Sequence, residues 1–215
     1  MLFEGFGKDL EMHHTVHDTF IAKTFMRWMA ITLFKASGWK AAGQRPGIPK
    51  YVIIAAPHTS NWDFVYTICL AFILEIDPMI MMKRAWFHWP MGTFLRWLGA
   101  FPVDRSGSHN VVVQSIETFN KHERMVMVVP PSGTRKKVTH WKSGFYHIAR
   151  GAGVPVVLGY LDYKHKVGGI GPTVPVTGHM ESDMKAIRDF YGDIQGKYPG
   201  KKGDAFVFSE SEMLP

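Results

Sequence analysis

The apolar run Val52–Ala56 constrains this chain most, because polar side chains suited to chemistry follow it at once. The run is short and uninterrupted, which is typical of a strand that is buried on both faces of a sheet. Pro57 ends the run, His58 follows it, and Asp63 comes five residues later, just before a helical pattern over 64–74. The sequence therefore predicts that His58 lies at the carboxyl end of a strand, where open α/β sheets bind ligands.

The spacing of His58 and Asp63 suits acid–base chemistry. A neutral imidazole accepts a proton only through a free ring nitrogen, and a carboxylate at the other nitrogen fixes that tautomer and stabilises the imidazolium. The two side chains can meet across one turn, and no serine or cysteine nucleophile is needed if the substrate supplies the hydroxyl. Taken alone, the pair is more typical of a loop histidine beside an aspartate that caps a helix, because this spacing is common by chance.

The size and charge of the chain limit its class. The 215 residues suffice for one domain, or for one domain with a short appendage. The formal charge of +7 favours anionic partners such as phosphate groups, nucleic acid or an anionic membrane surface. The basic residues are scattered and no DNA- or RNA-binding motif accompanies them, so we expect no nucleic-acid partner.

Two further totals bear on compartment and membrane. The single cysteine, Cys69, cannot form an internal disulfide, which indicates a buried thiol in a reducing compartment. No stretch reaches about 18 uncharged apolar residues, and no signal peptide is visible, so we expect no spanning helix.

Short apolar runs alternate with helical patterns over most of the chain. This alternation predicts an α/β fold with a central mixed, largely parallel sheet flanked by helices. We expect strands at 52–56, 79–82, near 101, and at 124–129, 153–160 and 173–177. We expect helices at 64–74, 109–122, 142–149 and 182–191, a turn at 163–171, a linker at 41–50 and a loosely held tail at 196–215.

The N-terminal part reads as an attachment to this domain. Residues 1–45 form a lead-in and an amphipathic helix over Thr19–Trp39, and residues 46–215 form the α/β domain. The helix is apolar over much of its circumference and carries Lys23, Arg27 and Lys35. Such a helix either packs on its own domain or lies in the interface of an anionic membrane, and both interpretations stay open here.

Two other clusters invite a functional interpretation. His13 and His17 have the i, i+4 spacing of some zinc sites, but no third ligand is evident nearby, so we expect surface histidines and no metal site. The tryptophan-rich segment Trp86–Trp97 indicates an exposed apolar surface, the wall of an acyl-chain pocket, or an aromatic core.

Polar groups follow three of the expected strands. Besides His58, Arg105 follows one strand and the segment 132–135 follows another. If these strands are neighbours, Arg105, Thr134 and Arg135 would converge on a cradle for a phosphate, with backbone amides freed by Gly133. Taken alone, the basic run 135–137 is more typical of a solvated surface.

Four blocks in this order resemble the glycerolipid acyltransferases, the family that includes the lysophosphatidate acyltransferases. The resemblance covers about residues 45–160, and Lys83 and the turn at 90–92 stand where that family commonly has a lysine and a Pro-Phe-Gly-like turn. The blocks are His58-Thr-Ser-Asn-Trp-Asp63, Phe101-Pro-Val-Asp-Arg-Ser106, Ser132-Gly-Thr-Arg135 and Val154-Pro-Val-Val157.

The resemblance implies transfer of a fatty acyl group from an acyl-CoA or acyl carrier protein thioester to a hydroxyl of a lysophospholipid or related glycerolipid. It implies that His58 is the general base and that Asp63 orients it. No metal or cofactor is required beyond the thioester co-substrate. The groups implied for substrate binding are Arg105, Ser132, Gly133, Thr134 and Arg135 for the acceptor, and Lys83 for the oxyanion.

One position departs from the family pattern. Ser132 stands where the family has a glutamate that is associated with the acceptor, so the acceptor need not be lysophosphatidate. The alternative is a non-catalytic lipid-binding or membrane-surface protein on the same scaffold. In either case we expect peripheral or monotopic attachment to the cytoplasmic face of a membrane.

Overall fold

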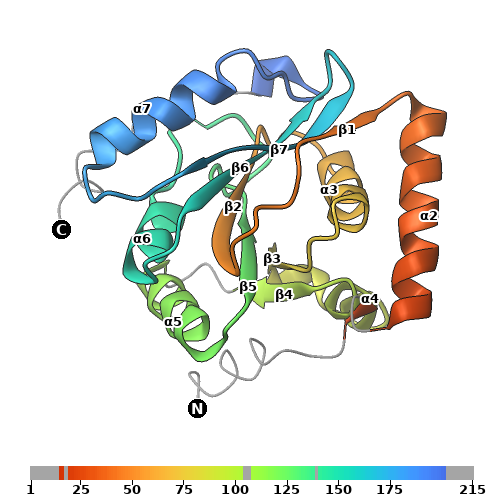
Figure 1. Ribbon diagram of the computed structural model, residues 1–215, viewed down its shortest axis with the longest axis horizontal. Coiled ribbons are helices and arrows are strands. Elements are labelled where there is room, and N and C mark those ends of the chain that lie inside the picture. The colour runs from red at the N-terminus through yellow and green to blue at the C-terminus, as the bar shows by residue number, and fades with distance from the viewer. Residues whose placement is uncertain (1–14, 17–18, 104–107, 139, 202–215) are drawn as a thin grey trace.

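The computed structural model describes residues 15–16, 19–103, 108–138 and 140–201. Within these residues the strands form a seven-stranded sheet in the order β1-β7-β6-β2-β5-β3-β4 (Figure 1). Neighbouring strands are parallel except β6 and β7, so the prediction of a mixed, largely parallel sheet is confirmed. The strands are β1 Lys40–Ala42, β2 Lys50–Ala56, β3 Pro78–Lys83, β4 Ala100–Val103, β5 Met125–Val129, β6 Val156–Asp162 and β7 Val167–Val174.

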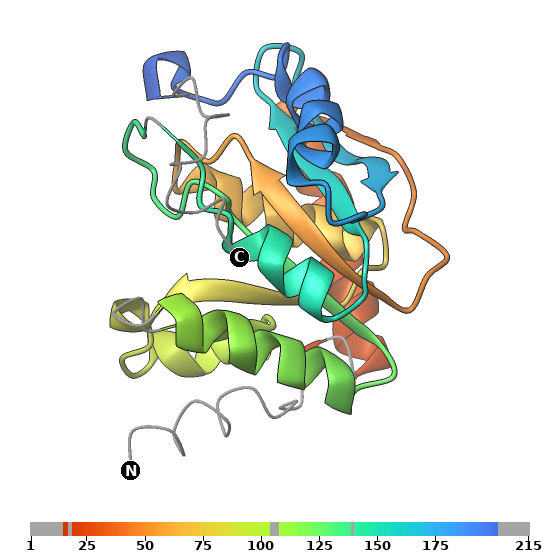
Figure 2. The same ribbon diagram turned by 90° about the vertical axis from the view of Figure 1, so that its left-hand side faces the viewer.

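Helices cover both faces of the sheet. One face carries α2, α3 and α4, and the other carries α5, α6 and α7 (Figure 1), which face the viewer in Figure 2. The α-helices are α2 Phe20–Ser37, α3 Trp62–Ile73, α4 Met91–Trp97, α5 Ser108–Lys121, α6 Gly144–Gly151 and α7 Met180–Tyr191. Short 3₁₀ turns lie at Arg84–Trp86 (η2) and Pro199–Lys201 (η3).

Strand β2 is central in the sheet, which explains why its sequence is a continuous apolar run. Val52 and Ile54 belong to the core beneath α5, α6 and α7, whereas Tyr51 and Ile53 belong to the core beneath α2, α3 and α4. Both sets are buried, so helices cover both faces of β2. The expected burial of Cys69 is also confirmed, and burial raises the pKa of its thiol to about 11.

Three local predictions were wrong in detail. The linker at 41–50 contains part of the short edge strand β1, which pairs in parallel with β7. The expected turn at 163–171 is shorter, because β7 begins at Val167 and ends at Val174 instead of spanning 173–177. Glycines at 168, 169 and 171 hide the strand pattern of β7, and its pairing on both sides with β1 and β6 overrides their weak propensity.

Helix α2 matches the predicted amphipathic helix and ends at Gly38, whose φ of 74° forms the left-handed cap that glycine favours. Its inner face buries Ala30 and Phe34 against the domain. Its basic residues do not all point to solvent, because Lys23 pairs with Asp77 at 3.6 Å and Arg27 pairs with Glu75. Over the described ranges we find no helix whose length and hydropathy would let it cross a bilayer.

Candidate active site

The site lies at the carboxyl edge of the parallel strands. β2, β5, β3 and β4 are neighbours that run in the same direction, so the loops that follow them emerge at one edge. His58 follows β2, and Ser132 to Arg135 follow β5, the strand next to it. The topology thus places His58 and the segment 132–135 at a common edge of the sheet.

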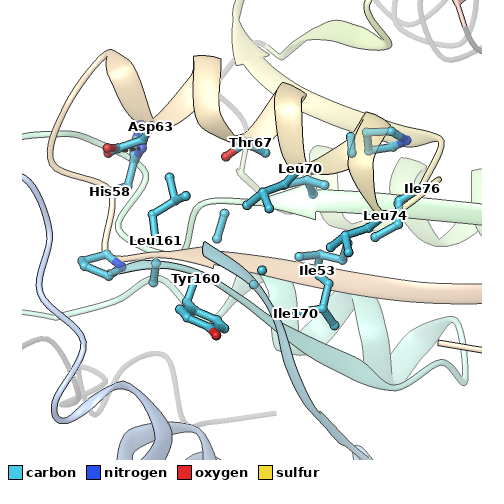
Figure 3. Close-up of a pocket in the computed structure, with 18 residues that line it drawn as sticks. Ile53, His58, Asp63, Thr67, Leu70, Leu74, Ile76, Tyr160, Leu161 and Ile170 are labelled. Carbon is cyan, nitrogen blue, oxygen red and sulfur yellow. Dashed lines mark ion pairs between the residues drawn. The ribbon is translucent and has the colours of Figure 1, made fainter. Parts of the chain in front are cut away.

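His58 and Asp63 face each other at this edge. His58 Nδ1 lies 3.2 Å from Asp63 Oδ2, an ion-pair distance (Figure 3). Helix α3 begins at Trp62, two residues earlier than the sequence indicated, so Asp63 stands in its first turn, where the helix dipole favours a negative charge. Because Nδ1 faces the carboxylate, Nε2 is the nitrogen left for a substrate.

Asp63 is almost fully buried, with 3% of its surface exposed, and its carboxylate accepts hydrogen bonds from several directions. Its Oδ2 accepts the backbone N–H groups of Thr59 at 2.7 Å and Ser60 at 2.8 Å. Its Oδ1 accepts the hydroxyl of Tyr163 at 2.7 Å. Burial by itself would raise the pKa of Asp63, but the contacts with His58, Tyr163 and Ser60 outweigh burial and lower that pKa. The carboxylate is therefore ionised at neutral pH.

A cavity extends from this pair between α3 and the sheet. Together with its open mouth it encloses about 580 Å³. His58 and Asp63 lie at one end, and Leu74 and Ile76 lie at the other (Figure 3). Apart from Asp63, His58, Thr67 and Tyr160, the lining side chains are apolar or glycine.

The cavity exists because small residues are paired beneath α3. Ala55 of β2 is in register with Gly159 of β6, so two neighbouring positions on the face toward α3 have almost no side chain. Leu70 and Ala71 of α3 roof this space. A methyl group at Gly159 would approach Ile53 Cγ2 to 2.7 Å, so glycine allows β2 and β6 to pack this closely at the floor of the cavity.

The loop after β5 is ordered by its own polar groups. Ser132 Oγ donates to the carbonyl of Thr134 at 2.8 Å, and Thr134 Oγ1 accepts the N–H of Lys136 at 3.3 Å. Gly133 has a φ of 63°, in the left-handed region that glycine favours. Ser132, Thr134 and Arg135 are half-buried, and none of them lines the cavity.

Of the remaining predicted residues, only Lys83 lies within the described ranges. Lys83 is exposed at the end of β3, with β5 between it and β2. Arg105 lies outside the described residues, as do His13 and His17. Neither the Thr19–Trp39 helix nor the Trp86–Trp97 segment lines this cavity, so the cavity does not support the interpretation of the Trp86–Trp97 segment as an acyl-chain wall. Both expose several large apolar side chains.

Sequence reasoning missed two parts of this site. Tyr163 reaches Asp63 from the turn after β6, a hundred positions along the chain, and no local pattern marks it. The segment after α7, predicted as a loose tail, packs on the loop of His58, since the N–H of Tyr198 donates to Thr59 Oγ1 at 3.3 Å and Lys197 lies 5.2 Å from the ring centre of Trp62. Gly196 packs so closely on Thr59 that a side chain would not fit there, and this glycine is the sequence feature that could have indicated the contact.

Comparison with known proteins identifies the family to which this chain belongs. The family model described as Acyltransferase matches residues 44–158. A 1-acyl-sn-glycerol-3-phosphate acyltransferase from Streptococcus pneumoniae is 29% identical over 119 residues, which cover 52% of this chain and 44% of that protein. The match thus spans less than half of the relative's length.

A solved structure shows the same fold. The 1-acyl-sn-glycerophosphate (LPA) acyltransferase PlsC from Thermotoga maritima superposes with a TM-score of 0.57 at 15% sequence identity, covering 91% of this chain and 90% of that one. The family match includes His58, Asp63 and the loop after β5, and it ends within β6. The chain belongs to the acyltransferase family, and its motifs resemble those of the glycerolipid acyltransferases.

Proposed function

We propose that this protein transfers a fatty acyl group from an acyl-CoA or acyl carrier protein thioester to a hydroxyl of a lysophospholipid or related glycerolipid. The observation that carries the proposal is the contact between His58 and Asp63 at the mouth of an apolar cavity. The pair supplies a base that can deprotonate an alcohol, and the cavity supplies an apolar surface that can shield an acyl chain from water. Each methylene so buried contributes about 0.8 kcal/mol.

In the first step the acceptor hydroxyl binds at Nε2 of His58. As the oxygen attacks the thioester carbonyl carbon, its proton moves to Nε2, and the carbonyl oxygen becomes an oxyanion. Asp63 keeps the imidazole in the productive tautomer and stabilises the positive charge that forms. General-base catalysis of this kind contributes about 10²–10⁴ in rate.

In the second step the tetrahedral intermediate collapses. The carbon–sulfur bond breaks, the ester is released, and the proton on Nε2 passes to the departing thiolate. His58 is neutral again at the end of the cycle, so no covalent enzyme intermediate is needed. The thioester is already activated, and the chain's task is to hold two substrates and move one proton.

The acceptor's anionic group would bind to the loop after β5. Arg135 and Thr134 carry this assignment, together with Arg105 beyond the end of β4 and the backbone near Ser132 and Gly133. A guanidinium offers a fork of donors that matches phosphate oxygens. Lys83 as an oxyanion donor has the least support, because it is exposed and β5 separates it from β2.

The lipid substrates would be met at a membrane surface, on its cytoplasmic face, by peripheral or monotopic attachment. Helix α2 supports this, because its outer face leaves Phe20 82%, Ile21 79% and Trp28 64% exposed. Large apolar side chains exposed together on one helix face mark an interaction site. Since Lys23 and Arg27 pair with acidic residues of the domain, apolar insertion contributes more here than attraction to anionic lipid.

The test is a screen of lysolipid acceptors with both classes of acyl donor, with mass spectrometry of the product and release of the thiol as readouts. His58→Ala should keep its fold and lose about 10²–10⁴ of the turnover. His179→Ala, at an exposed histidine before α7, is the matched control and should be unaffected. Full turnover in His58→Ala would refute the assignment of the base.

The alternative, a non-catalytic lipid-binding protein, rests on Ser132. It predicts binding to lysolipid vesicles with no consumption of either thioester. Both measurements on the same sample therefore separate the two functions.

A further inference from the structure

We infer that Tyr163 is a positioning residue of the active site, which acts on His58 through Asp63. This inference rests on the proposed role of the His58–Asp63 pair. The Tyr163 hydroxyl donates to Asp63 Oδ1 at 2.7 Å, while the other oxygen, Oδ2, faces His58 and the loop backbone. Each carboxylate oxygen thus has its own partners, and the plane of the carboxylate is defined from two sides.

Tyr163 is itself held firmly. Its backbone N–H donates to the carbonyl of Gln195 at 2.9 Å. Its ring meets Trp39 edge-on, with centroids 4.8 Å apart and planes at 88°, and meets Tyr66 at 6.0 Å and 82°. Aromatic pairs in this geometry have a preferred orientation, so the ring directs its hydroxyl toward Asp63.

The chemistry of this hydrogen bond predicts its effect on the base. A donor on a carboxylate draws charge toward itself and lowers the carboxylate's attraction for a neighbouring cation. The Tyr163 hydroxyl therefore moderates the pull of Asp63 on the imidazolium form of His58. Without it, Asp63 would hold the proton on His58 more strongly, and Oδ1 would lose the hydroxyl that fixes its position.

Several titratable groups of the described residues lie near the pair. His58 and Tyr163 face Asp63 directly. Tyr66 from α3 packs on Tyr163, and Tyr198 from the segment after α7 lies near enough to interact with it electrostatically. Of the neighbouring charges, Asp162 is engaged by His165 at 2.6 Å, and Lys197 lies over the ring of Trp62. None of these replaces the hydroxyl of Tyr163 as a donor to Asp63.

The experiment compares wild type, Tyr163→Phe and Tyr66→Phe in acyl transfer to a lysolipid acceptor over a range of pH. Tyr163→Phe keeps the ring and removes only the donor. We expect its kcat to fall about tenfold, as for a lost hydrogen bond to a charged group, with an unchanged KM. The acidic limb of its kcat/KM profile should move to higher pH. Tyr66→Phe removes a hydroxyl from the ring that packs on Tyr163 and should behave as wild type.

A second readout does not depend on turnover. In ¹⁵N-histidine-labelled protein, the His58 resonances, assigned by their loss in His58→Ala, should titrate at higher pH in Tyr163→Phe than in wild type. Unchanged kinetics and titration in Tyr163→Phe would overturn the inference. So would failure of Tyr163→Phe to fold while Tyr66→Phe folds, since the role would then be structural.

The two proposals fail separately. If wild type shows no acyl transfer, or if His58→Ala retains full turnover, the proposed function fails. If wild type is active and His58→Ala is inactive while Tyr163→Phe matches wild type, only the role of Tyr163 fails.

Discussion

Asp63 Oδ2 accepts the backbone N–H of Thr59 at 2.7 Å, so the carboxylate that contacts His58 also holds the loop on which His58 stands. Charge and loop geometry are therefore coupled at one side chain. Removing the carboxylate altogether would disturb both, whereas an amide can preserve the geometry alone.

Asp63→Asn separates the two contributions. An amide oxygen in place of Oδ2 can still accept the N–H groups of Thr59 and Ser60, so the loop should keep its shape, but the charge that stabilises the imidazolium is lost. We expect turnover to fall by about 10² or more with a small change in melting temperature. Activity near that of wild type would show that the charge of Asp63 does not matter to the reaction.

Filling the cavity should change acyl-chain preference. Thr67 lines the cavity from α3, so Thr67→Phe would occupy the space next to Leu70 (Figure 3). We expect transfer of long acyl chains to fall more than transfer of short ones, measured as kcat/KM across a donor series. Val65→Phe, at an exposed position of the same helix, is the control and should leave the series unchanged. Equal loss for all chain lengths would place the acyl chain elsewhere.

Polar substitutions on the outer face of α2 should weaken membrane attachment. Phe20→Ser and Trp28→Ser together remove two large apolar side chains, each worth about 1.5–3 kcal/mol when fully buried. We expect liposome partition to fall at least tenfold and to depend little on salt. Val113→Ser removes an exposed apolar side chain from α5, on the other face of the sheet, and should not matter. Unchanged partition in the double variant would exclude this face.

Gly196→Ala should disturb the loop of His58 from the far end of the chain. A methyl group there would approach Thr59 Oγ1 to 2.7 Å and Thr59 Cγ2 to 2.8 Å, so the loop or the C-terminal segment must shift. We expect a fall in kcat of about tenfold or more, because small misplacement of a catalytic group is costly. Gly200→Ala has no atom within 4 Å of the new methyl group and is the matched control. Equal activities would show that the segment does not position the loop.

Asp183 should make folding sensitive to acid. Its carboxylate accepts the N–H of Thr177 at 2.8 Å, the hydroxyl of Thr177 at 2.9 Å and the hydroxyl of Tyr146 at 2.9 Å. Burial would raise the pKa of Asp183, but hydrogen bonds led by those from Thr177 outweigh burial and lower that pKa.

The lowered pKa of Asp183 determines how the stability of the fold changes with pH. A carboxyl group whose pKa is lower in the folded state stabilises the fold fully above its ordinary pKa of about 3.9, and this contribution disappears as pH falls through the lowered value. Asp183→Asn should cost about 1–3 kcal/mol of unfolding free energy at pH 7, with a smaller penalty at low pH. Asp189→Asn, which removes an exposed partner of Lys185, is the control. A penalty independent of pH would contradict the role of the charge.

Much of the fold was predictable, because β2, β3 and β5 pack against the core on both faces and their apolar runs are bounded by turn residues. β7 was misplaced, since its glycines at 168, 169 and 171 carry no strand signal and only its neighbours give it a partner on each side. The His58–Asp63 contact was predictable as well, because both residues flank a single strand-to-helix turn.

The sequence by itself determined the alternation of strands and helices and the motif that ends β2, since both follow from patterns within a few residues. Only the tertiary structure decided that β6 lies beside β2, and three features of the site depend on that neighbour. Ala55 meets Gly159 to leave a cavity, Tyr163 reaches Asp63, and the segment with Gly196 packs on Thr59. These contacts join residues about a hundred positions or more apart, and their geometry comes from strand order and register, which no local pattern encodes.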